Sequence, residues 1–111
     1  MSLADKKCEP CEGGTKPLSE GEAKNYFQEL KGWTLNKLSL EKLFSFQNFR
    51  ESMEFVNKVA DIANEEDHHP DIYIFYNKVR LELTTHAIGG LSVNDFIVAA
   101  KVDKVPNPAI K

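Results

Sequence analysis

The stretch NEEDHHPDIYIFYNKVRLELTTH, residues 64–86, contains all three histidines of the chain and its clearest strand pattern. Apolar and polar side chains alternate through DIYIFY and again through VRLELTTH, as is typical of half-buried strands. Asn77 and Lys78 separate the two runs, and a two-residue loop that begins with Asn favours a β-hairpin turn. The stretch therefore predicts an antiparallel hairpin with histidines at both ends.

A turn at Asn77–Lys78 would set the register of the two strands. The cross-strand pairs expected on the helix-covered face are Tyr76–Val79, Ile74–Leu81 and Ile72–Leu83. Continued to the ends of the hairpin, this register places His69 opposite His86 on the open, polar face, with Cβ atoms roughly 5 Å apart. Pro70 cannot donate to the ladder and marks the beginning of the strand, and His68 points towards the covered side. Two imidazoles on an open face suit proton exchange with one small ligand near neutral pH.

The segment before residue 48 predicts one helix and two strands. Ser19 is a suitable N-cap with Glu22 at the capping-box position, and Gly32 is expected to end the helix. Residues 33–36 and 38–46 alternate with period two, with a bulge or a turn at the Glu-Lys-Leu interruption. The apolar positions of these two strands are Trp33, Leu35, Leu38, Leu40, Phe44 and Phe46.

Two further helices are predicted, one on each side of the hairpin. The first begins after Asn48 and runs to Glu65 or Glu66. Its core stripe is expected to be Phe49, Met53, Val56, Val59, Ala60 and Ala63. The last helix begins at Ser92 with Asp95 at the capping-box position, and Pro106 and Pro108 are expected to stop it.

The predicted order is α-β-β-α-β-β-α. Alternating strands leave one face of a sheet for water, and amphipathic helices need one face to cover. We therefore expect an α+β fold with a four-stranded antiparallel sheet and three helices on one face. Residues 1–18 are expected to be a flexible N-terminal tail, 19–105 a single domain, and 106–111 a C-terminal tail.

Composition excludes several classes of protein. The chain has 111 residues, which suits one domain, and its 14 basic residues against 17 acidic ones form no basic stripe for nucleic acid. No apolar run approaches the ~20 residues needed to span a bilayer, and the first residues lack the apolar core of a signal peptide. We therefore expect a cytoplasmic protein without membrane or nucleic-acid partners.

Cys8 and Cys11 form one Cys-x-x-Cys motif, which is typical of half a zinc site or of a redox pair. A structural zinc site needs four ligands, and no second motif or nearby histidine completes the set. A redox motif should lie where a strand meets a helix, whereas this one lies in the predicted tail. We interpret both cysteines as part of a non-functional tail and expect no metal.

The hairpin segment resembles the signature of the pterin-4a-carbinolamine dehydratases. The matching residues are His-His-Pro at positions 68–70, the aromatic Tyr76, a third histidine at His86, and Asp95 in the following helix. The strand-and-helix pattern FSFQNFRESMEFVNKVADIA also resembles that family, so that the resemblance covers about residues 19–103. The family's fold, with helices on one side of a four-stranded antiparallel sheet, agrees with the fold expected above.

The resemblance implies an activity and a set of site residues. The substrate would be a 4a-hydroxytetrahydropterin, left when an aromatic amino acid hydroxylase uses its pterin, and no metal or organic cofactor would be needed. His68 and His86 match the acid–base residues, and His69 matches the residue that holds the pterin. Other matching positions near the site are Asp67, Pro70, Thr84 and Thr85. The family forms dimers or tetramers, so a homodimer or homotetramer is expected.

Two positions leave alternatives open. Asp95 matches the family but also suits a capping box that serves only its own helix. Asn64 stands where the family usually has an acidic residue, and an amide can hydrogen-bond but cannot carry a charge. The alternatives to catalysis are a non-catalytic pterin- or protein-binding dimerisation module of the transcriptional-cofactor type, and a metal-binding protein. The open sheet face with Tyr73 and Phe75 would suit the dimerisation module.

Overall fold

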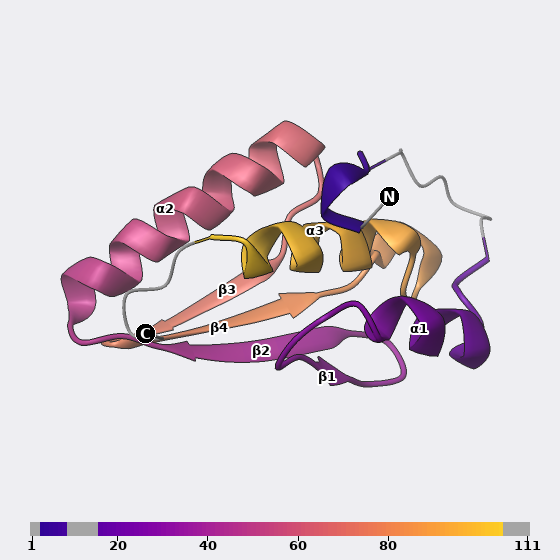
Figure 1. Ribbon diagram of the computed structural model, residues 1–111, viewed down its shortest axis with the longest axis horizontal. Helices are drawn as coiled ribbons and strands as arrows, with labels where there is room; N and C mark the ends of the chain where they lie inside the picture. The colour runs from indigo at the N-terminus through magenta and orange to yellow at the C-terminus, as the bar shows by residue number, and fades with distance from the viewer. Residues whose placement is uncertain (1–2, 9–15, 106–111) are drawn as a thin grey trace.

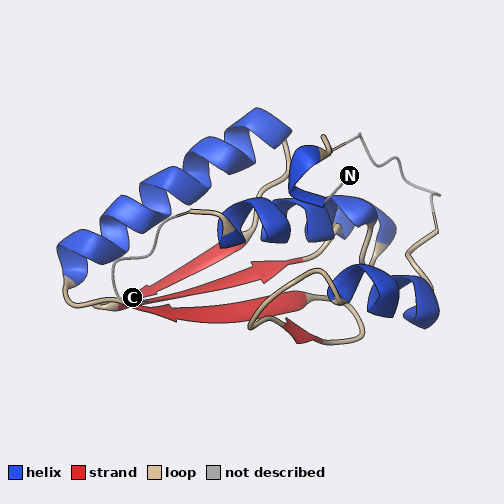
Figure 2. Ribbon diagram, in the orientation of Figure 1, coloured by secondary structure: helices blue, strands red, loops and turns tan. Residues whose placement is uncertain are grey.

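Four antiparallel strands form one sheet in the order β1-β2-β4-β3 in the computed structural model, which describes residues 3–8 and 16–105. The strands are β1 (Thr34–Leu35), β2 (Leu40–Ser45), β3 (Asp71–Phe75) and β4 (Lys78–Leu83). The α-helices are α1 (Glu20–Phe27), α2 (Phe49–Glu66) and α3 (Val93–Asp103), and two short 3-10 helices are η1 (Leu3–Asp5) and η2 (His86–Ile88). The expected α+β order is confirmed, and the helices lie on one side of the sheet (Figures 1 and 2).

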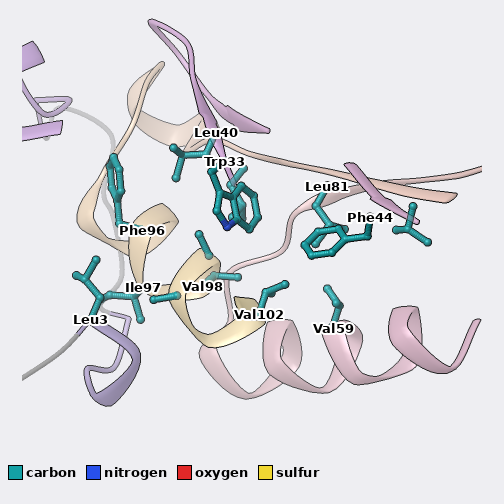
Figure 3. Close-up of a cluster of buried hydrophobic side chains, with 14 of the residues drawn as sticks. Leu3, Trp33, Leu40, Phe44, Val59, Leu81, Phe96, Ile97, Val98 and Val102 are labelled. Carbon is teal, nitrogen blue, oxygen red and sulfur yellow. The ribbon is translucent and has the colours of Figure 1, made fainter. Parts of the chain in front are cut away.

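The core lies between the central strands and the helices. Alternate residues of β4 are fully buried, namely Val79, Leu81 and Leu83. Leu81 and Phe44 from the sheet lie towards α2 and α3, as Figure 3 shows. Almost every side chain of α3 is buried, because the helix is covered by the sheet on one side and by η1 and α2 on the others. The ends of α2, α3 and β4 are therefore fixed relative to one another.

The predicted register of the hairpin is wrong by two residues. The turn is Tyr76–Asn77, and the observed pairs run from Phe75 opposite Lys78 to Asp71 opposite Glu82. The turn is held against the end of β2, because Phe46 N donates to Asn77 O over 2.7 Å and Asn77 Nδ2 donates to Phe46 O over 3.2 Å. A shift of two residues preserves which face each side chain occupies, so the covered and open faces are as expected.

The predicted core stripe of α2 is rotated relative to the observed one. The buried residues are Ser52, Phe55, Val59, Ala63 and Glu66. Phe49 is exposed, and Met53, Val56 and Ala60 lie at the margins of the buried face. Val59 and Ala63 belong to both stripes, while Phe55 was missed. The helix begins after Asn48 and ends at Glu66 as expected, and the Asn48 side chain accepts from Glu51 N over 2.9 Å.

The interruption expected in the second strand does not occur. β2 pairs with β4 along its whole length, from Leu40 opposite Leu83 to Ser45 opposite Lys78. Lys42 lies on the covered face, where its Nζ is 2.9 Å from Asp103 Oδ1 on α3. The charged Lys42 interrupts the apolar pattern in the sequence, but the strand continues through this position. The first helix shows the expected Ser19–Glu22 capping box but ends at Phe27, before Gly32.

Residues 3–8 are packed against the domain, in contrast to the flexible tail that composition predicts. Leu3 is only 1% exposed and belongs to the main core, and η1 packs on α3. Cys11, Pro106 and Pro108 lie outside the described residues, and α3 ends at Asp103. Within the described part of the chain, the helices are too short or too polar to cross a membrane.

The turn makes the observed register testable. Tyr76 has a φ of 53° and a side chain that is 66% exposed, so its backbone is in the left-handed region that favours glycine. We expect Tyr76→Gly to leave the free energy of unfolding unchanged or to raise it by up to about 1 kcal/mol. Lys78→Gly, within the paired strand β4, should lower it by about 1 kcal/mol. Urea unfolding followed by circular dichroism measures both, and the opposite order would contradict the register.

Candidate active site

The end of α2 directs His68 towards α3. Asp67 caps the helix in a left-handed conformation, with φ 53° and ψ 40°, and the backbone N–H groups of Asp67 and His68 both donate to Ala63 O. The chain thereby leaves the helix axis, and His68 Nε2 comes to lie 2.6 Å from Asp95 Oδ1. The expectation that His68 points towards the covered side is consistent with this contact, which joins α2 to α3.

Asp95 is completely buried and fully hydrogen-bonded. Its Oδ2 accepts from Thr85 Oγ1 over 2.8 Å and from Ser92 N over 2.9 Å. Ser92 Oγ lies 2.8 Å from Thr85 Oγ1 and donates to it, because the Thr85 proton is used on Asp95. Asp95 therefore caps α3 and also holds His68. Since a carboxylate only accepts, the hydrogen atom in this contact lies on Nε2 of His68.

His69 has a different partner from His68. Its Nε2 lies 3.2 Å from Asn64 Oδ1, one turn back along α2, and both side chains are exposed. The amide oxygen accepts the imidazole proton, so Asn64 orients His69 without adding a charge beside it. The position where the resembling family carries an acid is therefore used here for a neutral hydrogen bond.

His86 and Thr84 approach the site from the end of β4. The expected pairing of His69 with His86 across the ladder is not observed, because β4 ends at Leu83 and His86 begins η2. His86 is exposed, and Thr84 Oγ1 donates to Leu38 O over 2.6 Å. Thr85 is buried against Asp95, and its hydroxyl supports the carboxylate from the pocket wall.

The three histidines nevertheless line one pocket of about 610 Å³. This volume lies within the range of small-molecule sites in proteins. The remaining lining residues come from the N-terminal segment, the end of α2, the segment that follows β4 with η2, and the start of α3: Cys8, Glu65, Glu66, Asp67, Thr84, Thr85, Ala87 and Asn94. Pro70 is buried beside the site but does not line the pocket. The predicted register brought only His69 and His86 together, whereas all three histidines line the same pocket in the structure.

Two ionisable groups at the rim have shifted pKa values. Burial and the neighbouring Glu66 carboxylate raise the pKa of the Cys8 thiol to about 12, so this thiol is protonated at neutral pH. Burial opposes ionisation of Glu66, but the hydrogen bond from Cys8 N and the nearby Lys101 ammonium outweigh it and lower the pKa of Glu66. Cys8 was missed as a site residue, because its tail-like surroundings in the sequence carry no periodicity.

The described residues contain no group of three or more histidine, cysteine, aspartate or glutamate side chains that could hold a metal ion. Cys8 is the only cysteine that lies in the described segments, and its high pKa disfavours the thiolate that metals and redox reactions need. Besides the Cys8 thiol, the ionisable side chains that line the pocket are imidazoles and carboxylates.

Comparison with known proteins identifies the family. The family model described as pterin 4 alpha carbinolamine dehydratase matches residues 16–105. A Nitrosomonas eutropha protein named "Putative pterin-4-alpha-carbinolamine dehydratase" is 56% identical over 102 residues, which are 91% of this chain and 90% of that protein. A Nitrosospira multiformis protein of the same name is 54% identical over 101 residues, covering 91% and 89% of the two chains.

A solved structure shares the fold. The Brucella melitensis protein described as a transcriptional coactivator/pterin dehydratase superposes with a TM-score of 0.75 at 29% identity, covering 79% of this chain and 96% of its own. With the family match over most of the chain, the conclusion is plain: this chain belongs to the pterin 4 alpha carbinolamine dehydratase family.

The hydrogen bonds around Asp95 predict that substitution of Thr85 lowers the stability of the fold more than substitution of its neighbour Thr84. Thr85→Val removes a donor to buried Asp95 and an acceptor for Ser92, and should lower the free energy of unfolding by about 2 kcal/mol. Thr84→Val removes a bond to Leu38 O, which water can replace at this exposed position, and should cost less than about 1 kcal/mol. Urea unfolding of both variants measures the difference, and equal losses would contradict the assignment of Thr85.

Proposed function

We propose that this member of the family removes water from a 4a-hydroxytetrahydropterin and releases quinonoid dihydropterin. In this role it would regenerate the pterin of aromatic amino acid hydroxylases. The observation that carries the proposal is the 2.6 Å contact between His68 and the buried Asp95, at a pocket that His69 and His86 also line. Family membership supplies the substrate class.

The reaction needs one acid and one base. The C4a–O bond breaks, the hydroxyl leaves as water after receiving a proton, and N5 loses its proton as the C4a–N5 double bond forms. One proton is delivered and one is removed, so the reaction neither consumes nor releases a net proton. Two imidazoles near neutral pH can do both. We therefore propose that no metal or organic cofactor takes part.

We assign the base to His68 and the acid to His86. Asp95 accepts from His68 Nε2, and its negative charge would stabilise the imidazolium that forms when Nδ1 takes up the N5 proton. No hydrogen bond to the His86 ring is found within residues 3–8 and 16–105, and its ring is exposed at the pocket. His69 is engaged by Asn64, which leaves His86 as the second histidine at the pocket that could carry the proton. His86 would therefore protonate the leaving hydroxyl.

The remaining polar groups would hold the pterin. The pyrimidine edge of a pterin presents N–H donors, and Asp67 offers an exposed carboxylate at the pocket. His69, oriented by Asn64, would contact the ring, and Thr84 lies on the same wall as His86. Thr85 and Asp95 would act through His68, because the Thr85 hydroxyl donates to Asp95 and Asp95 accepts from His68.

A second candidate is a non-catalytic dimerisation module. The observation in its favour is an exposed apolar group on the open sheet face, formed by Leu43, Tyr73 and Phe75. The Brucella melitensis protein is described as a coactivator as well as a dehydratase. Pterin turnover no faster than the uncatalysed rate, together with a stable complex with a transcription regulator, would favour this candidate over the enzyme.

The same surface supports self-association. The open face carries Leu43 and Phe75 with more than half of each side chain exposed, and β3 is an edge strand of the sheet. We propose a homodimer or a homotetramer of this chain in the cytoplasm. Light scattering coupled to size-exclusion chromatography distinguishes the two from a monomer.

The histidine roles predict large losses of rate. We expect His68→Ala and His86→Ala each to lower kcat for dehydration of a 4a-hydroxytetrahydropterin about 10²-fold, because each removes one proton-transfer group. Lys58→Ala, an exposed substitution on α2, serves as the matched control and should keep the wild-type rate. Stopped-flow absorbance follows the reaction. A wild-type rate equal to the uncatalysed rate would overturn the proposed activity.

The hydrogen bond between Asn64 and His69 predicts that an acidic residue at position 64 would change the catalytic efficiency only slightly. Its amide oxygen already accepts from His69, so we expect Asn64→Glu to change kcat/KM by less than about threefold. Asn64→Leu, which has a similar size but no acceptor, should lower kcat/KM by about tenfold. The same assay measures both. A gain above about tenfold in Asn64→Glu would mean that the amide impairs this site.

A further inference from the structure

We propose that residues 3–8 form an N-terminal clasp that closes one wall of the pocket and contributes to pterin affinity. The inference rests on the proposed function, since it names a binding role at the same site. The clasp lies outside residues 16–105, the part of the chain that matches the family model.

The clasp is attached to the core at its beginning. Leu3 is 1% exposed and lies beside Ile97 of α3 (Figure 3), and η1 packs on α3. Leu3 N donates to Glu29 Oε1 over 3.2 Å, and Lys6 N donates to Leu3 O over 3.1 Å. Figure 1 shows η1 between α3 and the end of α2. Burial of the Leu3 side chain stabilises the docked position of η1 through the hydrophobic effect. The composition of residues 3–8 does not indicate this contact.

The clasp is attached to the site at its end. Cys8 N donates to Glu66 Oε1 over 2.9 Å, and Cys8 Sγ donates to Asn94 O over 3.7 Å. Glu66 is the last residue of α2, two positions before His68, and Asn94 directly precedes Asp95. Lys101 Nζ lies 3.5 Å from the other Glu66 oxygen. One residue thus bridges the two helices whose ends carry the His68–Asp95 pair.

Cys8 is also part of the pocket surface. It lines the cavity together with Glu66 and Asn94, the two residues to which it is bonded. Its thiol is protonated, so it presents a neutral, weakly polar wall beside the carboxylates of α2. A flat ring bound between the histidines would therefore be enclosed by the clasp on this side. Without the clasp, this side of the pocket would be open to water.

The clasp should affect binding more than chemistry. Asp95 is held by Thr85 and Ser92, neither of which belongs to the clasp, and it holds His68 in turn. Loss of the clasp would remove a wall while the His68–Asp95 pair remains. A wall that contacts the substrate and the transition state equally stabilises both to the same extent. Its loss therefore raises KM and changes kcat little.

Two full-length variants release the clasp in different ways. Leu3→Ser removes the apolar side chain that docks η1 in the core. Cys8→Pro removes the backbone N–H that donates to Glu66, since proline has no such group. Lys6→Ala is the matched control, because its side chain is exposed on the same segment. Thermal unfolding of each variant establishes that the domain is folded before kinetics are measured.

The kinetic arm measures KM and kcat for the 4a-hydroxytetrahydropterin. We expect Leu3→Ser and Cys8→Pro to raise KM by about tenfold and to change kcat by less than about threefold, with Lys6→Ala unchanged. A KM equal to that of the wild type in both folded variants would overturn the proposal. A purely structural role would lower the melting temperature and leave KM as it is.

A ligand-free arm keeps the test independent of the proposed activity. Iodoacetamide modification of Cys8 at pH 8, followed by mass spectrometry, should be slow in the wild type and at least about tenfold faster in Leu3→Ser, where the thiol regains an ordinary pKa. Equal rates would mean that the clasp is open in solution and would overturn the proposal. Absence of turnover in a wild type that still protects Cys8 would instead count against the proposed function.

Discussion

The structure around the site depends on one buried carboxylate. Asp95 has no exposure to water, and an unpaired charge at such a position would be costly. It is stabilised by the N-terminal end of α3, by Thr85 after β4 and by His68 after α2. Each of these partners comes from a different element. The requirement to satisfy one charge therefore brings the ends of β4, α2 and α3 together, and the pocket is the space that remains between them.

Much of the fold could be predicted from the sequence because two periodicities were clear. The alternation in the hairpin and the caps at Ser19, Asn48 and Ser92 led to the observed order of elements. The register could not be predicted, because turns at Tyr76–Asn77 and Asn77–Lys78 both fit the sequence, and the contacts of Asn77 with Phe46 that decide between them are tertiary. The α2 stripe was misjudged because apolar side chains border its buried face on one side.

Several of the predicted site residues line the pocket, but the contacts between them were not predicted. All three histidines line the pocket, as their clustering and the family resemblance suggested, yet the cross-strand pair of His69 and His86 does not form. The capping-box reading and the supporting reading of Asp95 both hold, since the same carboxylate accepts from Ser92 N and from His68. Cys8 could not have been found from the sequence, because its place at the pocket depends on the docking of Leu3 in the core, which is a tertiary contact.

The three histidines are made different by their partners and not by their exposure alone. His68 contacts a carboxylate and His69 contacts an amide, while His86 lies exposed at the end of β4. The carboxylate and the amide oxygen each accept a hydrogen bond from one ring nitrogen and fix the orientation of the ring, whereas the ring of His86 is open to solvent. In the proposed mechanism, these different surroundings give identical side chains the separate tasks of base, ligand holder and acid. An acid at position 64 would reduce this difference, because it would give His69 the same kind of partner as His68.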